Sequence, residues 1–242
     1  MDAVLPPSTR RRDLLELIFG YGLILLVIWT PRPYQPLLYC LASIVLAVIT
    51  WISFRSSQAM GLRVQNLLRS LWIVGLSLVL SALAFVLAIH FDTIHGIDGP
   101  IAFIKRYWGY ALWSFAQQIL LQDFVLQRLL RLTHSRRASI LIAAGIFALA
   151  HLPNPVLTPL TLIWGLAACA LFLRYRNLYP LAFAHALLGI TLATTIPGHV
   201  IRNLRVGRGY FTYTAPIHHR NHWDQTVSTN AWVTADAPTR RA

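Results

Sequence analysis

The sequence is poor in charge, and acidic residues are its scarcest kind. Charged residues make up 12% of the 242 residues, and only 8 residues are Asp or Glu. A soluble domain carries about a quarter charged residues, so this composition excludes an ordinary water-soluble protein. Glu16 is the only glutamate and Lys105 the only lysine. With 56% hydrophobic residues and a mean hydropathy of +0.56, the chain is predicted to be a polytopic membrane protein.

Cysteine is scarce as well. Cys40 and Cys169 both lie inside apolar runs, so we expect neither a disulfide nor a metal site there. No motif in the chain points to a bound cofactor. The first apolar run has no small-residue cleavage site after it, which favours a retained first span over a cleaved signal peptide.

The formal net charge of +13 does not indicate nucleic-acid binding. Arginines cluster between apolar runs, as in loops that flank membrane spans. If the N-terminus is cytoplasmic, short outer loops hold only Arg32, Lys105 and Arg106. The inner side then holds Arg10, Arg11, Arg12, Arg55, Arg63, Arg69, Arg128, Arg131, Arg136, Arg137, Arg174 and Arg176. This positive-inside bias predicts a cytoplasmic N-terminus.

The expected fold is all-α, a polytopic transmembrane helix bundle of about seven spans. A span needs roughly 20 mostly apolar residues, and the apolar runs suggest spans at 14–30, 37–54, 70–91, 108–130, 138–151, 157–174 and 178–197. Residues 1–13 form a basic N-terminus, 14–197 the bundle and 198–242 a polar tail. Aromatic and β-branched residues alternate over 208–213, which predicts a short strand, and the rest of the tail reads as disordered.

Two histidines inside apolar helices are the first candidate functional residues. His151 follows the run 140–150, and His185 lies within 181–188. An imidazole in hydrocarbon is costly unless it is paired or faces water, so each marks a candidate site. Each could also simply form an interhelical or helix-end hydrogen bond.

The span at 108–130 is the most polar. Ser114, Gln118 and Gln122 recur every four residues and therefore share one helix face. Such residues either hydrogen-bond to neighbouring helices or line a cavity.

Together these residues resemble the CAAX prenyl protease and bacteriocin-processing family of intramembrane endopeptidases, over about residues 108–197. The family has paired glutamates followed by arginine, then Phe-x-x-x-His, then His followed four residues later by Asn or Asp. Phe147 and His151 fit the second motif, and His185 begins the third. The resemblance implies a polytopic peptide-bond hydrolase of the membrane, with a bacterial inner membrane as its expected location.

The chain departs from two of the three motifs. Gln117 and Gln118 fall where the paired glutamates would be, and Gly189 stands where Asn or Asp is expected. The register Gln122-Asp123 is the alternative, but it brings the first motif closer to His151. The resemblance implies His151, His185, Gln117 and Gln118 as the catalytic set, although a neutral amide has no useful basicity.

Several functions stay open from the sequence. A histidine could act as base, since imidazole titrates near neutrality, and Asp123 is a less favoured substitute because an undistorted helix turns it away from Gln117 and Gln118. Alternatively, the chain is a non-catalytic relative that binds a peptide, lipid or membrane-protein partner in the same cavity. Haem ligation by the two histidines is a third, disfavoured reading. The expected partners are the lipid bilayer and a peptide or membrane protein, without nucleic acid.

A second histidine cluster lies in the tail. His218, His219, His222 and Asp224 have a spacing that a metal could use, but a solvated, flexible segment explains the same composition better.

Overall fold

The computed structural model describes residues 7–52, 60–62, 64, 66–97 and 99–214, and every regular element in these ranges is helical. The elements, in chain order, are α1 (Pro7–Trp29), α2 (Gln35–Ile52), α3 (Leu67–Ser70), α4 (Trp72–His90), α5 (Pro100–Ile119), a π-helix (Leu120–Leu126), α6 (Gln127–Thr133), α7 (Arg136–Leu149), α8 (Leu157–Tyr175), α9 (Tyr179–Thr195), α10 (Gly198–Ile201), a 3₁₀ turn (Arg202–Leu204) and α11 (Arg208–Phe211). The predicted all-α class is confirmed for this part of the chain.

Three helices are long and apolar enough to cross a membrane, namely α2, the α3–α4 segment Leu67–His90, and α8. A fourth span is possible if α9 is counted together with the sharply bent segment Gly198–Leu204. These helices support the prediction that the chain is a membrane protein, but they do not confirm the predicted number of seven spans. The remaining predicted spans are helical, although α7 has only 14 residues and α1 begins with a run of charged residues.

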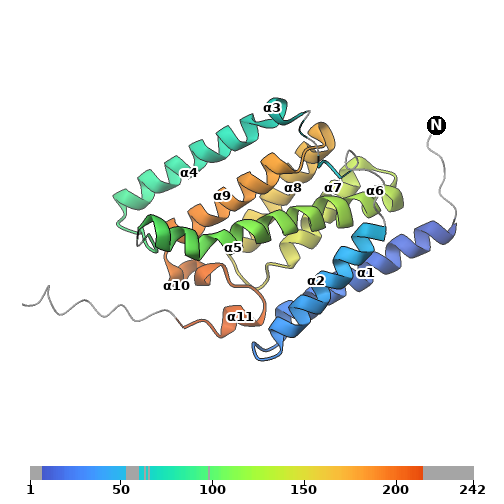
Figure 1. The fold of residues 1–242 in the computed structure, drawn as a ribbon, viewed down its shortest axis with the longest axis horizontal. Coiled ribbons are helices and arrows are strands. Elements are labelled where there is room, and N and C mark those ends of the chain that lie inside the picture. The colour runs from blue at the N-terminus through green and yellow to red at the C-terminus, as the bar shows by residue number, and fades with distance from the viewer. Residues whose placement is uncertain (1–6, 53–59, 63, 65, 98, 215–242) are drawn as a thin grey trace, which may run out of the picture.

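The bundle is organised around α9 and the α7–α8 pair. Helix α9 packs against α4 on one side and α5 on the other, and α7 packs along α8 (Figure 1). The α1–α2 hairpin forms a separate pair, and its α1 helix packs against α6 and α11. The hydrophobic core gathers residues of α7, α8, α9 and the π-helix, including Phe124, Phe147 and Phe172.

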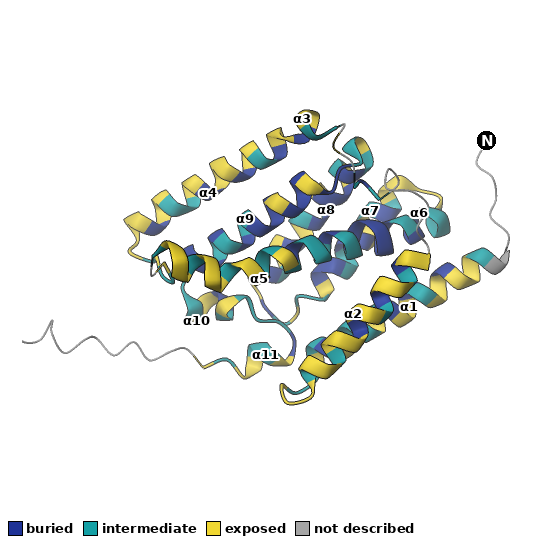
Figure 2. Ribbon diagram, viewed as in Figure 1, coloured by how far each residue is buried: buried dark blue, intermediate teal, exposed yellow. Residues whose placement is uncertain are grey.

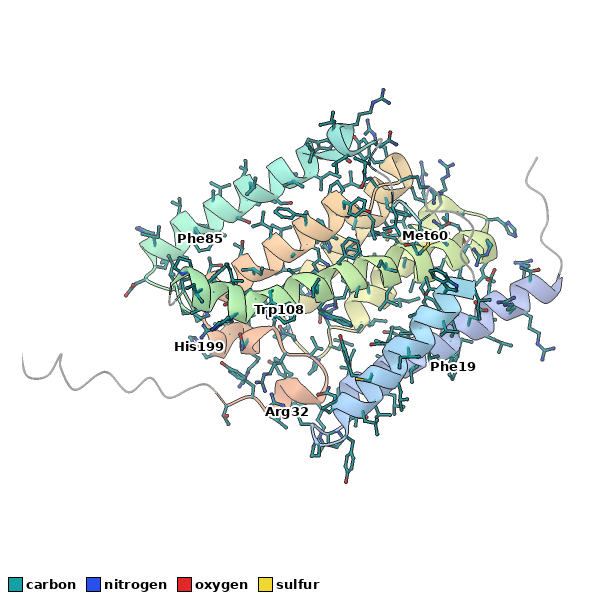
Figure 3. The ribbon with its side chains drawn as sticks, viewed as in Figure 1. Phe19, Arg32, Met60, Phe85, Trp108 and His199 are labelled. Carbon is teal, nitrogen blue, oxygen red and sulfur yellow. The ribbon has the colours of Figure 1, made fainter. Side chains whose placement is uncertain are left out.

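The outer faces of the bundle are apolar. Figure 2 shows exposed residues along the outer sides of α4 and α2, while α9 and the π-helical region are buried. Phe19 of α1 and Trp108 of α5 belong to this exposed set (Figure 3). Since backbone polar groups are satisfied within the helices, such a surface suits hydrocarbon, and the protein contacts the lipid bilayer here.

The start of the predicted tail is folded, contrary to expectation. Residues 208–211 form α11, so the predicted strand at 208–213 is wrong. A strand needs a partner strand for its backbone groups, and the described residues offer none, whereas a helical turn lets Thr212 N–H bond to the Arg208 carbonyl. The histidine cluster at 218–224 lies outside the described residues.

Gly207 and Asn154 hold this segment in place. The Gly207 N–H donates to the Leu152 carbonyl at 2.7 Å. Gly207 has a φ of +54°, and a Cβ there would overlap Ile28 near the end of α1; both conditions demand glycine. Asn154 donates from Nδ2 to the carbonyls of Ile201 and Arg205. The segment 198–211 therefore closes one end of the bundle.

Candidate functional site

One continuous helical stretch, Pro100–Thr133, carries the predicted polar face. Ser114, Gln118 and Gln122 each have fully buried side chains, as their four-residue spacing predicts. Its middle, Leu120–Leu126, is π-helical. Such wide turns are rare and often occur at functional sites.

Gln118 is the link between this face and α9. Its Nε2 lies 3.1 Å from Nδ1 of His185, and Gln122 Nε2 donates to Gln118 Oε1 at 3.2 Å. Because an amide nitrogen only donates, Nδ1 of His185 must accept. His185 is therefore neutral with its proton on Nε2, and this nitrogen is available as a donor.

His151 has the opposite tautomer. Its Nδ1 lies 2.7 Å from the carbonyl oxygen of Phe147, one turn earlier in the chain. A carbonyl only accepts, so Nδ1 carries the proton. In the neutral imidazole Nε2 then presents a lone pair. The two histidines thus offer one donor and one acceptor.

Phe147 brings the two histidines together. Its ring contacts both His151, at a centroid distance of 4.8 Å, and His185, at 5.9 Å. The spacing Phe-x-x-x-His places His151, in the turn just after α7, one turn beyond Phe147 on the same side. Trp164 of α8 contacts His185 as well, at 5.8 Å. Its Nε1 is buried and has no hydrogen-bond partner within the described structure, a costly state for a donor.

Gln117 lies on a different side of the helix. It is half-buried, and no hydrogen bond of its side chain is found among the described residues. Gly109, Trp113 and Gln117 follow at four-residue steps, and Gly109 and Trp113 line a groove of about 280 Å³ between α2 and α5. The structure therefore brings Gln118, His151 and His185 together, and Gln117 makes no hydrogen bond to either histidine among the described residues. Gln122, which belongs to the less favoured register Gln122-Asp123, joins this group through its hydrogen bond to Gln118.

Asp123 is buried beside this network without joining it. Both carboxyl oxygens lack hydrogen bonds, as does Nε2 of Gln127. No hydrogen bond therefore joins Asp123 to Gln127. Arg176, near the predicted inner surface, acts on it electrostatically. No acidic side chain contacts His151 or His185 in the part of the chain that the structure describes.

Tyr110 and Gly189 form a contact that sequence reasoning missed. A Cβ at Gly189 would overlap the phenolic oxygen of Tyr110 and lie 2.6 Å from its Cζ. Gly189 lies one turn after His185, so the phenol of Tyr110 fills the place where the third motif has Asn or Asp. That Tyr110 occupies the place of the motif's Asn or Asp becomes visible only when α5 is packed against α9.

The features together define a polar site buried between the helices of a membrane protein. Residues 108–191 match the family model described as type II CAAX prenyl endopeptidase, Rce1-like. The predicted resemblance is thereby confirmed for this central segment, which includes His151, His185 and both glutamine registers. No curated protein and no solved structure matches the chain. The described residues contain no group of three or more His, Cys, Asp or Glu side chains that could hold a metal ion.

Proposed function

We propose that this protein binds a peptide segment within the membrane, using His151 and His185 to hold a peptide bond, and does not hydrolyse it by a glutamate mechanism. The single observation that carries the proposal is the pair of contacts at Nδ1 of the two imidazoles, with the Gln118 amide nitrogen at His185 and the Phe147 carbonyl at His151, from which we infer opposite tautomers. A peptide group has one N–H and one C=O. His151 Nε2 suits the first, and His185 Nε2–H suits the second.

The membrane setting strengthens this match. A peptide group unpaired in hydrocarbon costs several kcal/mol, so a segment that leaves helical structure needs partners from the protein. Trp164 Nε1 supplies a further donor next to His185. The similarity to CAAX endopeptidases makes the C-terminal segment of a prenylated protein the first candidate ligand.

The lack of a carboxylate base argues for binding without hydrolysis. Gln118 faces His185 where a base would be needed, and the only glutamate is held by Arg128 on another surface. Loss of general-base catalysis typically lowers a rate by about 10²–10⁴. The second candidate function is slow hydrolysis with His151 as base, favoured by the lone pair on its Nε2.

The first test measures binding and cleavage together, with a fluorescent farnesylated peptide that ends in a CAAX sequence and the purified protein in nanodiscs. We expect saturable binding without cleavage, and His151→Ala should weaken it about tenfold, the equivalent of about one hydrogen bond to a buried group. His199→Ala changes an exposed histidine of α10 and serves as the matched control. Cleavage that His151→Ala abolishes would establish the second candidate. Cleavage insensitive to His151→Ala would refute both.

Replacing single glutamines by glutamate tests which residue occupies the base position. We expect Gln118→Glu to raise hydrolysis of the same peptide by up to about 10²-fold, because a carboxylate there adjoins His185. Gln117→Glu should have no effect, since Gln118 and not Gln117 contacts His185. The measurement is the initial cleavage rate for each variant. A gain with Gln117→Glu alone would show that the Gln118–His185 contact is not the reactive arrangement.

A further inference from the structure

The segment that follows α9 folds back across one end of the bundle and lies outside the family-matched residues. The chain turns by 120° between α9 and Gly198–Leu204. The carbonyls of Ile201 and Arg205 then accept hydrogen bonds from the buried side chain of Asn154, in the turn just before α8. Helix α8 is long and apolar enough to cross a membrane, so its beginning and the segment beside it lie at the membrane–water interface.

The first turn of this segment has a strained backbone. Arg202, Asn203 and Leu204 have φ angles of +51°, +49° and +57°, a left-handed conformation that residues with a Cβ disfavour. Such strain persists only where the surrounding structure holds it, and it is concentrated at functional sites. Here the Arg205 N–H donates to the Arg202 carbonyl at 3.1 Å, and Asn154 binds the carbonyls on both sides of the turn. The fold therefore fixes the places of Arg202 and Arg205.

The charge of this segment is entirely positive. Residues 198–214 include Arg202, Arg205 and Arg208 but no Asp or Glu. Within the described part of the chain, no ion pair joins any of these arginines to an acidic side chain. A guanidinium without a carboxylate partner in the protein keeps its N–H groups available for an anion from outside, and phosphate is the anion that suits its geometry.

Two tyrosines orient two of the arginines. The guanidinium carbon of Arg202 lies over the Tyr210 ring, 5.4 Å from its centre, and that of Arg205 lies over the Tyr213 ring at 5.3 Å. Both distances are in the range of a cation–π interaction. The ring contacts a face of the guanidinium, whereas the N–H groups lie in its plane, so the contact positions the arginine and leaves its donors for a phosphate.

Exposed apolar side chains accompany these charges. Phe211 is 66% exposed, and Val200 is exposed as well. Phe211 contacts Trp29 at the end of α1, another exposed aromatic residue. Aromatic rings gather at the level of the lipid headgroups, and basic residues beside them attract anionic lipid. A water-soluble acidic partner would match the arginines but would leave these apolar side chains without a counterpart, so the combination favours lipid.

We propose that residues 198–213 form a binding surface for anionic phospholipid, in which Arg202, Arg205 and Arg208 bind the phosphate groups and Phe211 lies at the boundary with the acyl chains. The strained turn and the two tyrosines hold the arginines in place before lipid binds. This inference concerns a surface next to the polar site, so it does not depend on whether that site binds or cuts a peptide.

The test measures the binding of phosphatidylglycerol and of phosphatidylcholine to the full chain, by native mass spectrometry from detergent. We expect phosphatidylglycerol to bind at least about tenfold more tightly, because each basic residue near an anionic headgroup contributes about fivefold. The triple variant Arg202→Gln, Arg205→Gln, Arg208→Gln should lose this preference. Equal affinity of the unchanged protein for the two lipids would overturn the proposal.

A second triple variant with the same change in net charge is the matched control. Arg69, Arg136 and Arg137 are exposed and lie at the opposite end of the bundle, where α7 begins and α8 ends. Replacing these three by Gln should leave the preference for phosphatidylglycerol unchanged. An equal loss in both triple variants would show that net charge alone attracts the lipid, and the proposed surface would be refuted.

Two further measurements complete the test. Arg208 is exposed, so Arg208→Gln keeps the fold intact if the triple variant does not, and it should weaken phosphatidylglycerol binding about fivefold. An unchanged affinity of this folded variant would contradict the proposal. Inorganic phosphate at millimolar concentration should leave the bound lipid in place, and displacement by it would mean that the arginines take free phosphate instead of a lipid.

Discussion

Asn154→Ala is expected to lower the free energy of unfolding by about 4 kcal/mol. Asn154 is fully buried and makes four side-chain hydrogen bonds. Its Nδ2 donates to the carbonyls of Ile201 and Arg205, and its Oδ1 accepts from the backbone N–H groups of Val156 and Leu157. Each buried group left unpaired costs about 1–3 kcal/mol, with some relief where water enters. Denaturation in detergent, followed by tryptophan fluorescence, measures the change.

A matched variant separates the contribution of the donor hydrogen bonds of Asn154 from that of its acceptor hydrogen bonds. Asn154→Asp keeps the acceptor bonds that begin α8 and loses the donor bonds to the segment after α9. It should therefore lose part of the stability, with increased hydrogen exchange confined to residues 198–211. A loss below about 1 kcal/mol for Asn154→Ala would mean that water replaces these bonds at little cost.

Gly189→Ala is expected to destabilise the protein by about 2–3 kcal/mol, although alanine is the better helix former. The added Cβ would overlap the Tyr110 hydroxyl, and overpacking of a tight interface costs about 1–3 kcal/mol. Gly145→Ala is the matched control, because a Cβ there meets no atom within 4 Å, and it should stabilise by up to about 1 kcal/mol. Thermal unfolding of both variants in the same detergent gives the comparison.

Removing Tyr110 should reverse this cost. In the double variant Tyr110→Ala with Gly189→Asn, the asparagine occupies the space that the phenol leaves, so the two changes together should cost clearly less than the sum of each alone. Restoring the third motif therefore requires both positions to change. Strict additivity of the two effects would contradict the assigned contact between Tyr110 and Gly189.

Much of the site could be predicted because it follows helical spacing. The buried face of Ser114, Gln118 and Gln122 follows from four-residue steps, and the pairing of Phe147 with His151 follows from the same rule. The location of His185 beside a glutamine agrees with the interhelical hydrogen bond expected for it. Of the two adjacent glutamines only Gln118 contacts His185 of α9, since one residue of helix rotation decides which amide faces α9.

Other features needed three-dimensional information. Nothing in the sequence of residues 120–126 distinguishes a π-turn from an α-turn. Tyr110 reads as one aromatic among many until α5 is placed against α9. Asn154 was hidden between Pro153 and Pro155, which account for the helix break without assigning a role to the residue between them. The strand predicted at 208–213 followed local alternation alone, which gives no partner strand.

The contacts of Gly207 and Asn154 also set the order in which the chain can mature during synthesis. The turn between α7 and α8 is made early, but the carbonyls that Asn154 requires belong to residues 201 and 205, and Leu152 waits for Gly207. Gly207 in turn packs against Ile28 of α1, far earlier in the chain. The nascent helices must therefore stay in the membrane with this end open until nearly the whole described chain has left the ribosome. Until then, the turn that follows His151 lacks the hydrogen bonds that Leu152 and Asn154 make to residues 201–207.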